Sequence, residues 1–220
     1  MDRPQFSRSE VVFMIGVPLA WAVLLLFHPG GEADEIYLNL EDQVTSALVV
    51  HIGMMLFIPM MAVAIFLLLR GVEGTAAKVS RIALVPFVVF FSAWETLQGT
   101  ANGVLAHELN ARPEEERASG AALIQDFAEN PIVRDLGIFA TLGSLAILVA
   151  MIAAGIALRR HAGAPVAVPI LLVLFGLVIG GHPPPYGPFA LACFAGAVFL
   201  FWRSQQAALA PARRGQPSPG

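Results

Sequence analysis

Six runs of apolar residues, each close to the length that crosses a lipid bilayer, constrain this chain more than any other feature of its sequence. A transmembrane helix needs about 20 apolar residues to cross a hydrocarbon core of about 30 Å. The chain is 57% hydrophobic and 13% charged, whereas about a quarter of the residues in a soluble domain are charged. We therefore predict an all-α polytopic membrane protein, in which residues 1–203 form one six-helix transmembrane bundle. The spans are expected at about 11–27, 44–69, 79–106, 136–158, 165–181 and 188–202.

The basic residues fall mostly on one side of the predicted spans. Of the 13 lysines and arginines, the larger group comprises Arg3, Arg8, Arg70, Lys78, Arg81, Arg159, Arg160, Arg203, Arg213 and Arg214, and the smaller comprises Arg112, Arg117 and Arg134. Cytoplasmic loops carry an excess of Lys and Arg, so both termini are predicted to be cytoplasmic. Arginine far outnumbers lysine, and Ala, Gly and Pro are abundant. We interpret this composition as bacterial and expect a plasma-membrane protein.

The two long loops on the opposite side, at about 28–43 and 107–135, are rich in Asp and Glu. They could bind a cationic or protein partner, whereas the net charge of −3 excludes a basic surface for nucleic acid. Pro113 followed by three glutamates is a typical helix start, which predicts a helix in the outer interface at about 113–129. The Ala-, Pro- and Arg-containing segment 204–220 is predicted to be a disordered cytoplasmic tail.

Glu95 is the polar residue that the third predicted span places deepest in the membrane. If that span ends near Ala106, Glu95 lies about 15 Å below the outer boundary. A charged carboxylate there costs at least a few kcal/mol, so an acid at this depth indicates a functional site. A neutral glutamate that bridges two helices is the alternative. Gln98 and Asn102 follow at spacings i+3 and i+7, which predicts that they share the face of Glu95.

Four of the five histidines belong to the outer half of the predicted bundle, where His51 lies about 9 Å deep. An imidazole can bind a transition metal or haem, or relay protons. We expect Glu95 and His51 to be catalytic, and His51, His182, His28 and His107 to be metal ligands. Gln98, Asn102, Thr141 and Ser144 are expected to support them. The alternatives are a helix-dipole contact for His28 and His107 and an interhelical hydrogen bond for His51.

These residues support one leading hypothesis and leave two others open. The leading one is an intramembrane His/Glu site that faces the extracytoplasmic side, in a metal- or haem-dependent enzyme acting on a lipid-like substrate. The alternatives are a transporter of a proton, an ion or a small solute, and a non-catalytic subunit or sensor that uses its acidic loops. Cys193 is the single cysteine, so a disulfide within the chain and a cysteine-based metal cluster are excluded.

Overall fold

The computed structural model describes residues 6–30 and 35–214, and it confirms the all-α prediction. The chain is 81% helical, and the described residues include no strand. Within the described part of the chain, five helices are long and apolar enough to cross a membrane, as expected of a multi-pass membrane protein. They are α1 (Arg8–Leu25), α3 (Val44–Leu68), the continuous helix Thr75–Asn110, α8 (Ile138–His161) and α10 (Tyr186–Arg214). The remaining apolar helix is shorter and consists of α9 (Ala167–Val178) and the 3₁₀ turn η3 (Ile179–Gly181).

The helix Thr75–Asn110 is interrupted by two π-helical segments. Its parts are α4 (Thr75–Pro86), η1 (Phe87–Phe91), α5 (Ser92–Trp94), η2 (Glu95–Ala101) and α6 (Asn102–Asn110). Pro86 lacks a backbone N–H, which loosens the helix just before η1. Segments of this kind are rare and frequently occur at functional sites. At 1.5 Å per residue the whole helix is about 54 Å long, so it extends well beyond a hydrocarbon core of about 30 Å.

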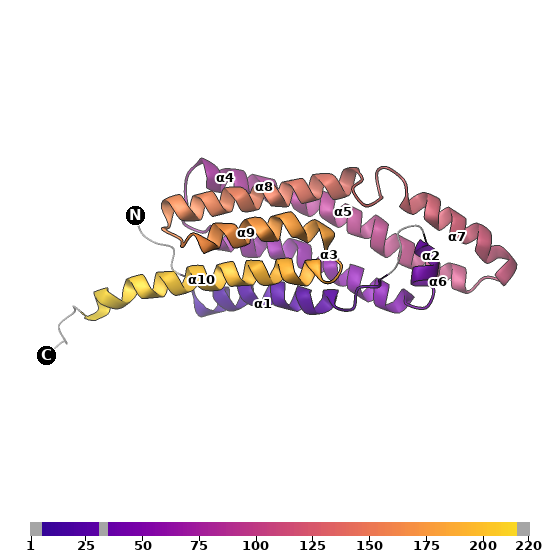
Figure 1. Ribbon diagram of the computed structural model, residues 1–220, viewed down its shortest axis with the longest axis horizontal. Coiled ribbons are helices and arrows are strands. Elements are labelled where there is room, and N and C mark those ends of the chain that lie inside the picture. Colours follow the sequence, from indigo (N-terminus) through magenta and orange to yellow (C-terminus); the bar gives the residue numbers. More distant parts are fainter. Residues whose placement is uncertain (1–5, 31–34, 215–220) are drawn as a thin grey trace.

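The apolar helices run side by side along the length of the molecule (Figure 1), and the contacts between them close a ring. Helix α1 packs against α3 and α10, and α9 packs against α10 and α8. Helix α8 then packs against α4 and η1, and α3 closes the ring by packing against η2. This order brings the end of α1 and the end of α9 close to η2, although the three segments are far apart in the sequence.

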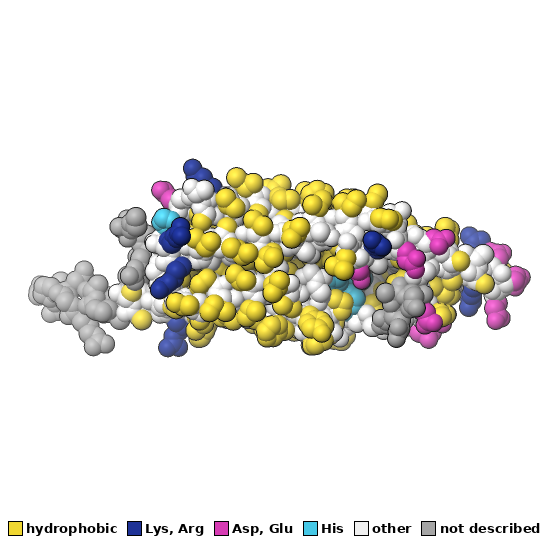
Figure 2. Space-filling model, turned by 45° about the horizontal axis from the view of Figure 1, so that its top comes forward, with side chains coloured by type: hydrophobic (Ala, Val, Ile, Leu, Met, Phe, Trp, Pro, Cys, Tyr) yellow, Lys and Arg dark blue, Asp and Glu magenta, His cyan; other side chains and the backbone are white. Residues whose placement is uncertain are grey.

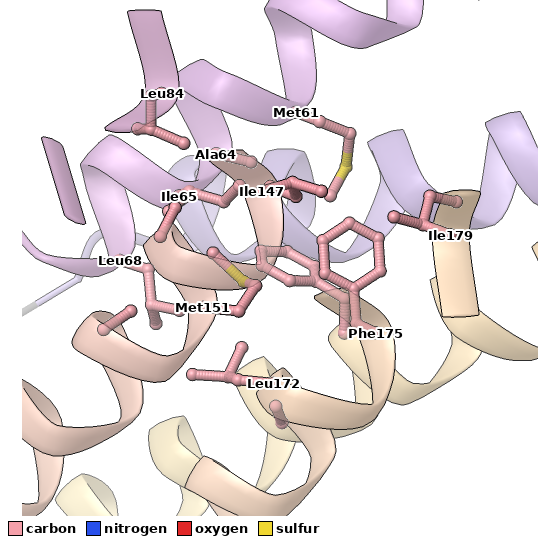
Figure 3. Packing of buried hydrophobic residues seen from close by; sticks show 14 of the residues in the cluster. Met61, Ala64, Ile65, Leu68, Leu84, Ile147, Met151, Leu172, Phe175 and Ile179 are labelled. Atoms are coloured by element: carbon pink, nitrogen blue, oxygen red, sulfur yellow. The ribbon is translucent and has the colours of Figure 1, made fainter. Parts of the chain in front are cut away.

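Tightly packed apolar side chains fill most of the interior of the ring (Figure 3). Met61, Ile65, Ile147, Met151 and Phe175 all belong to this core and are fully buried. Large apolar side chains also cover the outside of the helices in a broad girdle (Figure 2). Helices that carry apolar side chains on both their core-facing and their outer faces are typical of a protein embedded in lipid.

The two ends of the bundle differ in charge. Lys and Arg side chains gather at the end where α1 begins, and Asp and Glu side chains at the opposite end (Figure 2). At the acidic end, α6 and α7 (Glu114–Ala128) form a hairpin that packs on the short helix α2 (Ile36–Leu40). Helix α7 coincides with the helix predicted at 113–129, whereas α2 lies in a segment for which no helix was predicted.

The C-terminal segment differs from the prediction of a disordered tail at 204–220. Helix α10 continues from the membrane-length segment to Arg214, and residues 215–220 lie outside the described residues. Extending an existing helix requires no new nucleation. The Ala, Gln and Arg residues of this segment are also good helix formers, so local preference favours continuing the helix.

Candidate metal centre

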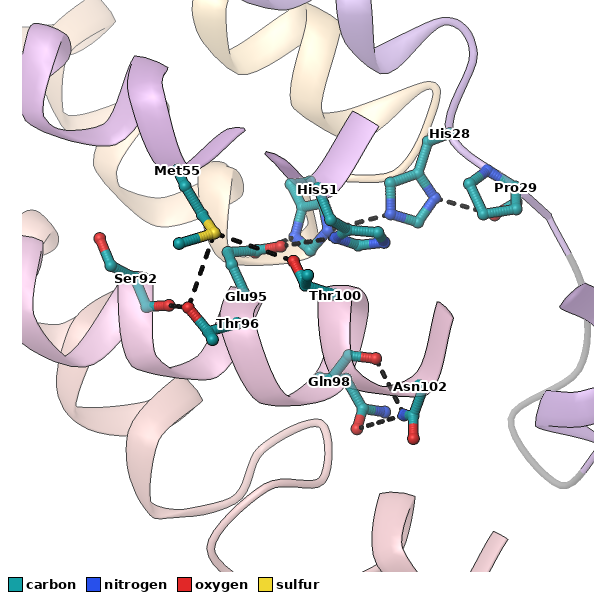
Figure 4. A network of polar contacts seen from close by, with 11 residues as sticks. His28, Pro29, His51, Met55, Ser92, Glu95, Thr96, Gln98, Thr100 and Asn102 are labelled. Atoms are coloured by element: carbon teal, nitrogen blue, oxygen red, sulfur yellow. Dashed lines mark hydrogen bonds and ion pairs between the residues drawn. The ribbon is translucent and has the colours of Figure 1, made fainter. Parts of the chain in front are cut away.

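Three histidines and one glutamate converge inside the ring at its acidic end (Figure 4). His28 follows α1, His51 lies on α3, Glu95 opens η2, and His182 follows η3. His51, Glu95 and His182 are buried, with Glu95 only 2% exposed. One potential ligand atom from each of His28, His51 and His182 lies within 4.8 Å of the others. The arrangement therefore has the dimensions of a site for a single metal ion.

The Nδ1 atom of each of the three rings faces an oxygen atom. His51 Nδ1 lies 2.9 Å from Glu95 Oε2, and His28 Nδ1 lies 2.8 Å from the carbonyl oxygen of Pro29. His182 Nδ1 lies 3.5 Å from Glu95 Oε1, and neither of these two buried atoms has a hydrogen-bond partner among the described residues. Because a carbonyl or carboxylate oxygen accepts, Nδ1 of His28 and His51 carries a proton. In their neutral forms, both rings keep a lone pair on Nε2.

The Nε2 atoms of His28 and His182 have the spacing that two ligands of one ion require. His28 Nε2 and His182 Nε2 lie 3.2 Å apart. Two nitrogens bound to one tetrahedral ion at about 2.0–2.1 Å would lie about 3.3 Å apart. Histidines that bind metals almost always donate the other ring N–H to a carboxylate or a carbonyl oxygen. The contacts at Nδ1 thus leave Nε2 as the natural ligand atom of His28 and His51. His182 Nε2 lies at hydrogen-bond distance from His28 Nε2 and would lose its proton on binding an ion.

The surroundings of His28 keep its ring neutral. Burial, followed by the nearby His182 and His51 rings, lowers the pKa of His28 to about 4. A histidine must be neutral to bind a metal ion. His28 therefore remains in a form that can bind metal throughout the physiological pH range.

Two glycines allow the histidines to approach the neighbouring backbone. A Cβ atom at Gly99, within η2, would overlap the His51 ring, and a Cβ atom at Gly187, on α10, would overlap the backbone carbonyl of His182. Both positions therefore require the absence of a side chain. Sequence reasoning missed these two residues, because nothing local marks them out from the other glycines of the chain.

A cavity of about 680 Å³ adjoins the cluster. Its polar wall includes the three histidines, Glu95, Gln98 and Asp135, and Thr141 and Ser144 of α8 also line it. Sequence reasoning placed Asp135 only among the acids of the outer loop. Its position directly before the fourth predicted span was the available signal. Burial at the rim of the cavity raises the pKa of Asp135.

Asn102 differs from the prediction that it shares the face of Glu95 and Gln98. The Asn102 side chain is buried and donates to the backbone carbonyl of Gln98 over 2.9 Å, and it does not line the cavity. The prediction assumed 3.6 residues per turn throughout. The wider π turn of η2 changes the angle between successive side chains, so the i+7 residue no longer follows the same face.

His107 lies apart from the cluster. It is exposed on α6, in a second hollow with Glu41, Asp42 and Asn110. The structure brings the other three predicted histidine ligands together. Among the described residues, no other histidine lines the hollow that contains His107, and its expected role as a metal ligand stays a prediction.

The ends of the neighbouring helices indicate the level of the cluster within the apolar girdle. Along the helix, Glu95 lies about 30 Å from Thr75 at the basic end, which is about the full thickness of a hydrocarbon core. His28 and His182 lie just beyond the ends of α1 and η3. The cluster is therefore near one edge of the apolar girdle.

No protein-family model, curated protein or solved structure matches this chain.

Proposed function

We propose that this protein is a metal-dependent membrane enzyme whose single transition-metal ion is held by His28, His51 and His182. The observation that carries the proposal is the convergence of the three rings, each with one potential ligand atom within 4.8 Å of the others, while an oxygen atom holds Nδ1 of His28 and of His51. Imidazole ligands suit Zn, Cu, Fe and Ni. Glu95 Oε1 and His182 Nδ1 are buried without a hydrogen-bond partner in the described part of the chain. A bound ion would reorient the His182 ring so that these two atoms could form a hydrogen bond.

The arrangement fits a bare ion better than haem. Haem iron takes its protein ligands along one axis, on one or both sides of the macrocycle. Three imidazoles gathered within 4.8 Å would instead compete for the same side. The three rings suit a tetrahedral ion that keeps its fourth position for water or substrate.

We infer that the reaction is hydrolysis. A zinc-type ion held by the three histidines would supply a bound water molecule with a pKa lowered to about 7 and would polarise a carbonyl group. In hydrolysis the oxygen of water bonds to the substrate carbonyl carbon, the bond to the leaving oxygen or nitrogen breaks, and a proton of the water passes to the leaving group. Glu95 orients two of the rings. Asp135, at the cavity rim, is placed to carry the proton.

For the membrane arrangement we propose six spans, counting α9 with η3 as the shorter one. The basic end would face the cytoplasm of a bacterial cell, according to the excess of Lys and Arg in cytoplasmic loops. The histidine cluster would then face the extracytoplasmic side. The closely packed apolar core between the cluster and the basic end supports an enzyme over a transporter, because a transport path needs polar groups at the midplane.

Metal analysis of the purified protein tests the proposal. After zinc loading and gel filtration, the wild type is expected to retain about one ion per chain, the number for a single three-histidine site. His51→Ala and His182→Ala are expected to lose it, whereas His107→Ala, the matched control on α6, is expected to keep it. A wild type that retains no ion from zinc, copper, iron or nickel, while eluting as a folded protein, would refute the metal centre.

A further inference from the structure

We propose that the substrate is an amphiphile with a long hydrocarbon chain, which enters from the bilayer at the outer ends of α8 and α9. Its headgroup would reach the three histidines while its chain lies against Leu145 and Leu177. This inference rests on the proposed function and specifies the class of substrate. A water-soluble substrate entering from the aqueous side is the competing outcome.

The cavity wall joins the interior of the ring to its lipid-facing surface. Leu145 on α8 and Leu177 on α9 both line the cavity, yet they are 53% and 63% exposed. Glu95 and His182, which line the same cavity, are buried. One continuous space thus touches buried polar groups and outward-facing leucines. In Figure 2, histidine side chains are visible at the edge of the apolar girdle, between apolar and acidic side chains.

Ser144 and Gly180 mark the place where α8 meets the segment η3 beside the cavity. A Cβ atom at Gly180 would come within 2.7 Å of Ser144 Oγ, so α8 and η3 are in close contact at this level. Both residues line the cavity. Leu145 and Leu177 lie beside this contact and face outwards, where the acyl chains of the bilayer would be.

Leu136 supplies an independent observation at the mouth of the cavity. It lines the cavity, is 89% exposed, and has a φ of 58°, a conformation that bulky residues rarely adopt. The conformation is held by a turn in which Gly137 N donates to the carbonyl of Arg134 and Thr141 Oγ1 donates to the carbonyl of Leu136. The fold therefore fixes a leucine outside the protein core beside the site. Strain of this kind clusters at ligand sites.

The level of the site agrees with an amphiphile. The histidine cluster lies near the edge of the apolar girdle, where lipid headgroups meet hydrocarbon. A lipid in that leaflet would have its polar group at the height of His182 and its chain along α8 and α9. A wholly water-soluble substrate would leave the apolar wall of Leu136, Leu145 and Leu177 unused.

Photolabelling of the zinc-loaded protein in phosphatidylcholine nanodiscs tests this inference. The probe is a palmitic acid analogue with a diazirine in its chain and a terminal alkyne, and the labelled peptides are mapped by mass spectrometry. Labelling is expected in residues 136–149 and 170–181. An excess of palmitic acid is expected to reduce it several-fold, whereas acetate at the same concentration is expected to leave it unchanged.

Matched variants separate the site from ordinary lipid contact. Leu177→Trp is expected to reduce the competed labelling several-fold. Ile170→Trp, which changes a residue 55% exposed on the same helix but outside the cavity wall, is expected to preserve it. Leu145→Trp and Val149→Trp form a second such pair on α8. Equal labelling in both members of each pair, or displacement by acetate, would overturn the proposal.

The zinc content of the same samples is measured in parallel, so the two proposals can fail separately. If the protein retains zinc but palmitic acid does not reduce the labelling, the amphiphile proposal is refuted and the metal centre is still supported. If the protein retains no zinc but palmitic acid reduces a labelling that depends on Leu177, the lipid site is supported and the proposed metal-dependent enzyme is refuted.

Discussion

His51 and Glu95, 44 positions apart in the sequence and on different helices, form a buried hydrogen bond of 2.9 Å between Nδ1 and Oε2. The other carboxylate oxygen of Glu95 faces His182 Nδ1. One side chain therefore orients two imidazoles and leaves their Nε2 atoms for a ligand. This relationship supports a role for Glu95 in positioning metal ligands, whereas the sequence alone predicted a catalytic role for it.

Replacement of Glu95 by glutamine tests that role. An amide has one accepting oxygen, so it can serve one imidazole N–H while its NH2 group opposes the other. Loss of such a partner typically lowers metal affinity about 10- to 100-fold. Competition with a chelating dye measures the zinc affinity. Exposed Glu73, replaced by glutamine in the same way, is the control, and equal affinities for the two variants would contradict the role.

Gly99→Ala is expected to displace the His51 ring and to abolish zinc retention, because the added Cβ would overlap that ring. The thermal transition should also move to lower temperature. Gly16 on α1 has open space at its Cβ position, so Gly16→Ala should retain zinc and gain stability, by up to about 1 kcal/mol from helix propensity. Zinc content and light-scattering melts check both. Normal zinc retention in Gly99→Ala would show that zinc binding does not need the close contact between Gly99 and His51.

Acid should destabilise the metal-free protein partly through His28. The pKa of His28 is about 4 in the folded protein, against about 6.5 for an unperturbed histidine. The unfolded chain therefore binds the proton first, and stability falls as the pH drops from about 6.5 towards 4, by up to about 3 kcal/mol. Melts at pH 7 and pH 5 in the presence of chelator should show a smaller acid shift for His28→Gln than for the wild type. The exposed His107→Gln variant should match the wild type, and an equal shift in all three proteins would exclude His28 as the cause.

Cysteine labelling tests the proposed orientation. In a Cys193→Ser background, a membrane-impermeant maleimide should label Ser119→Cys, on exposed α7, in intact cells. Glu73→Cys, in the turn before α4 at the basic end, should react only after the cells are permeabilised. The reverse pattern would place the histidine cluster on the cytoplasmic side and overturn the orientation.

Some of the site could be anticipated because it depends on local properties. Hydropathy marks the apolar helices, since every backbone polar group must be bonded within a helix when it crosses hydrocarbon. A carboxylate within such a helix, and histidines near the same ends of several helices, also stand out without tertiary information. Glu95, His28, His51 and His182 were selected in this way.

What the sequence determined by itself is the all-helical class and a set of candidate side chains that includes these four but also His107, because helix length and burial cost are local quantities. Only the tertiary structure decided that α1, α3, η2 and η3 meet, that Asn102 turns away from the cavity, and that Asp135 and Leu136 border it. The order of helices around the ring and the π turn of η2 depend on packing between distant segments, which local periodicity does not encode.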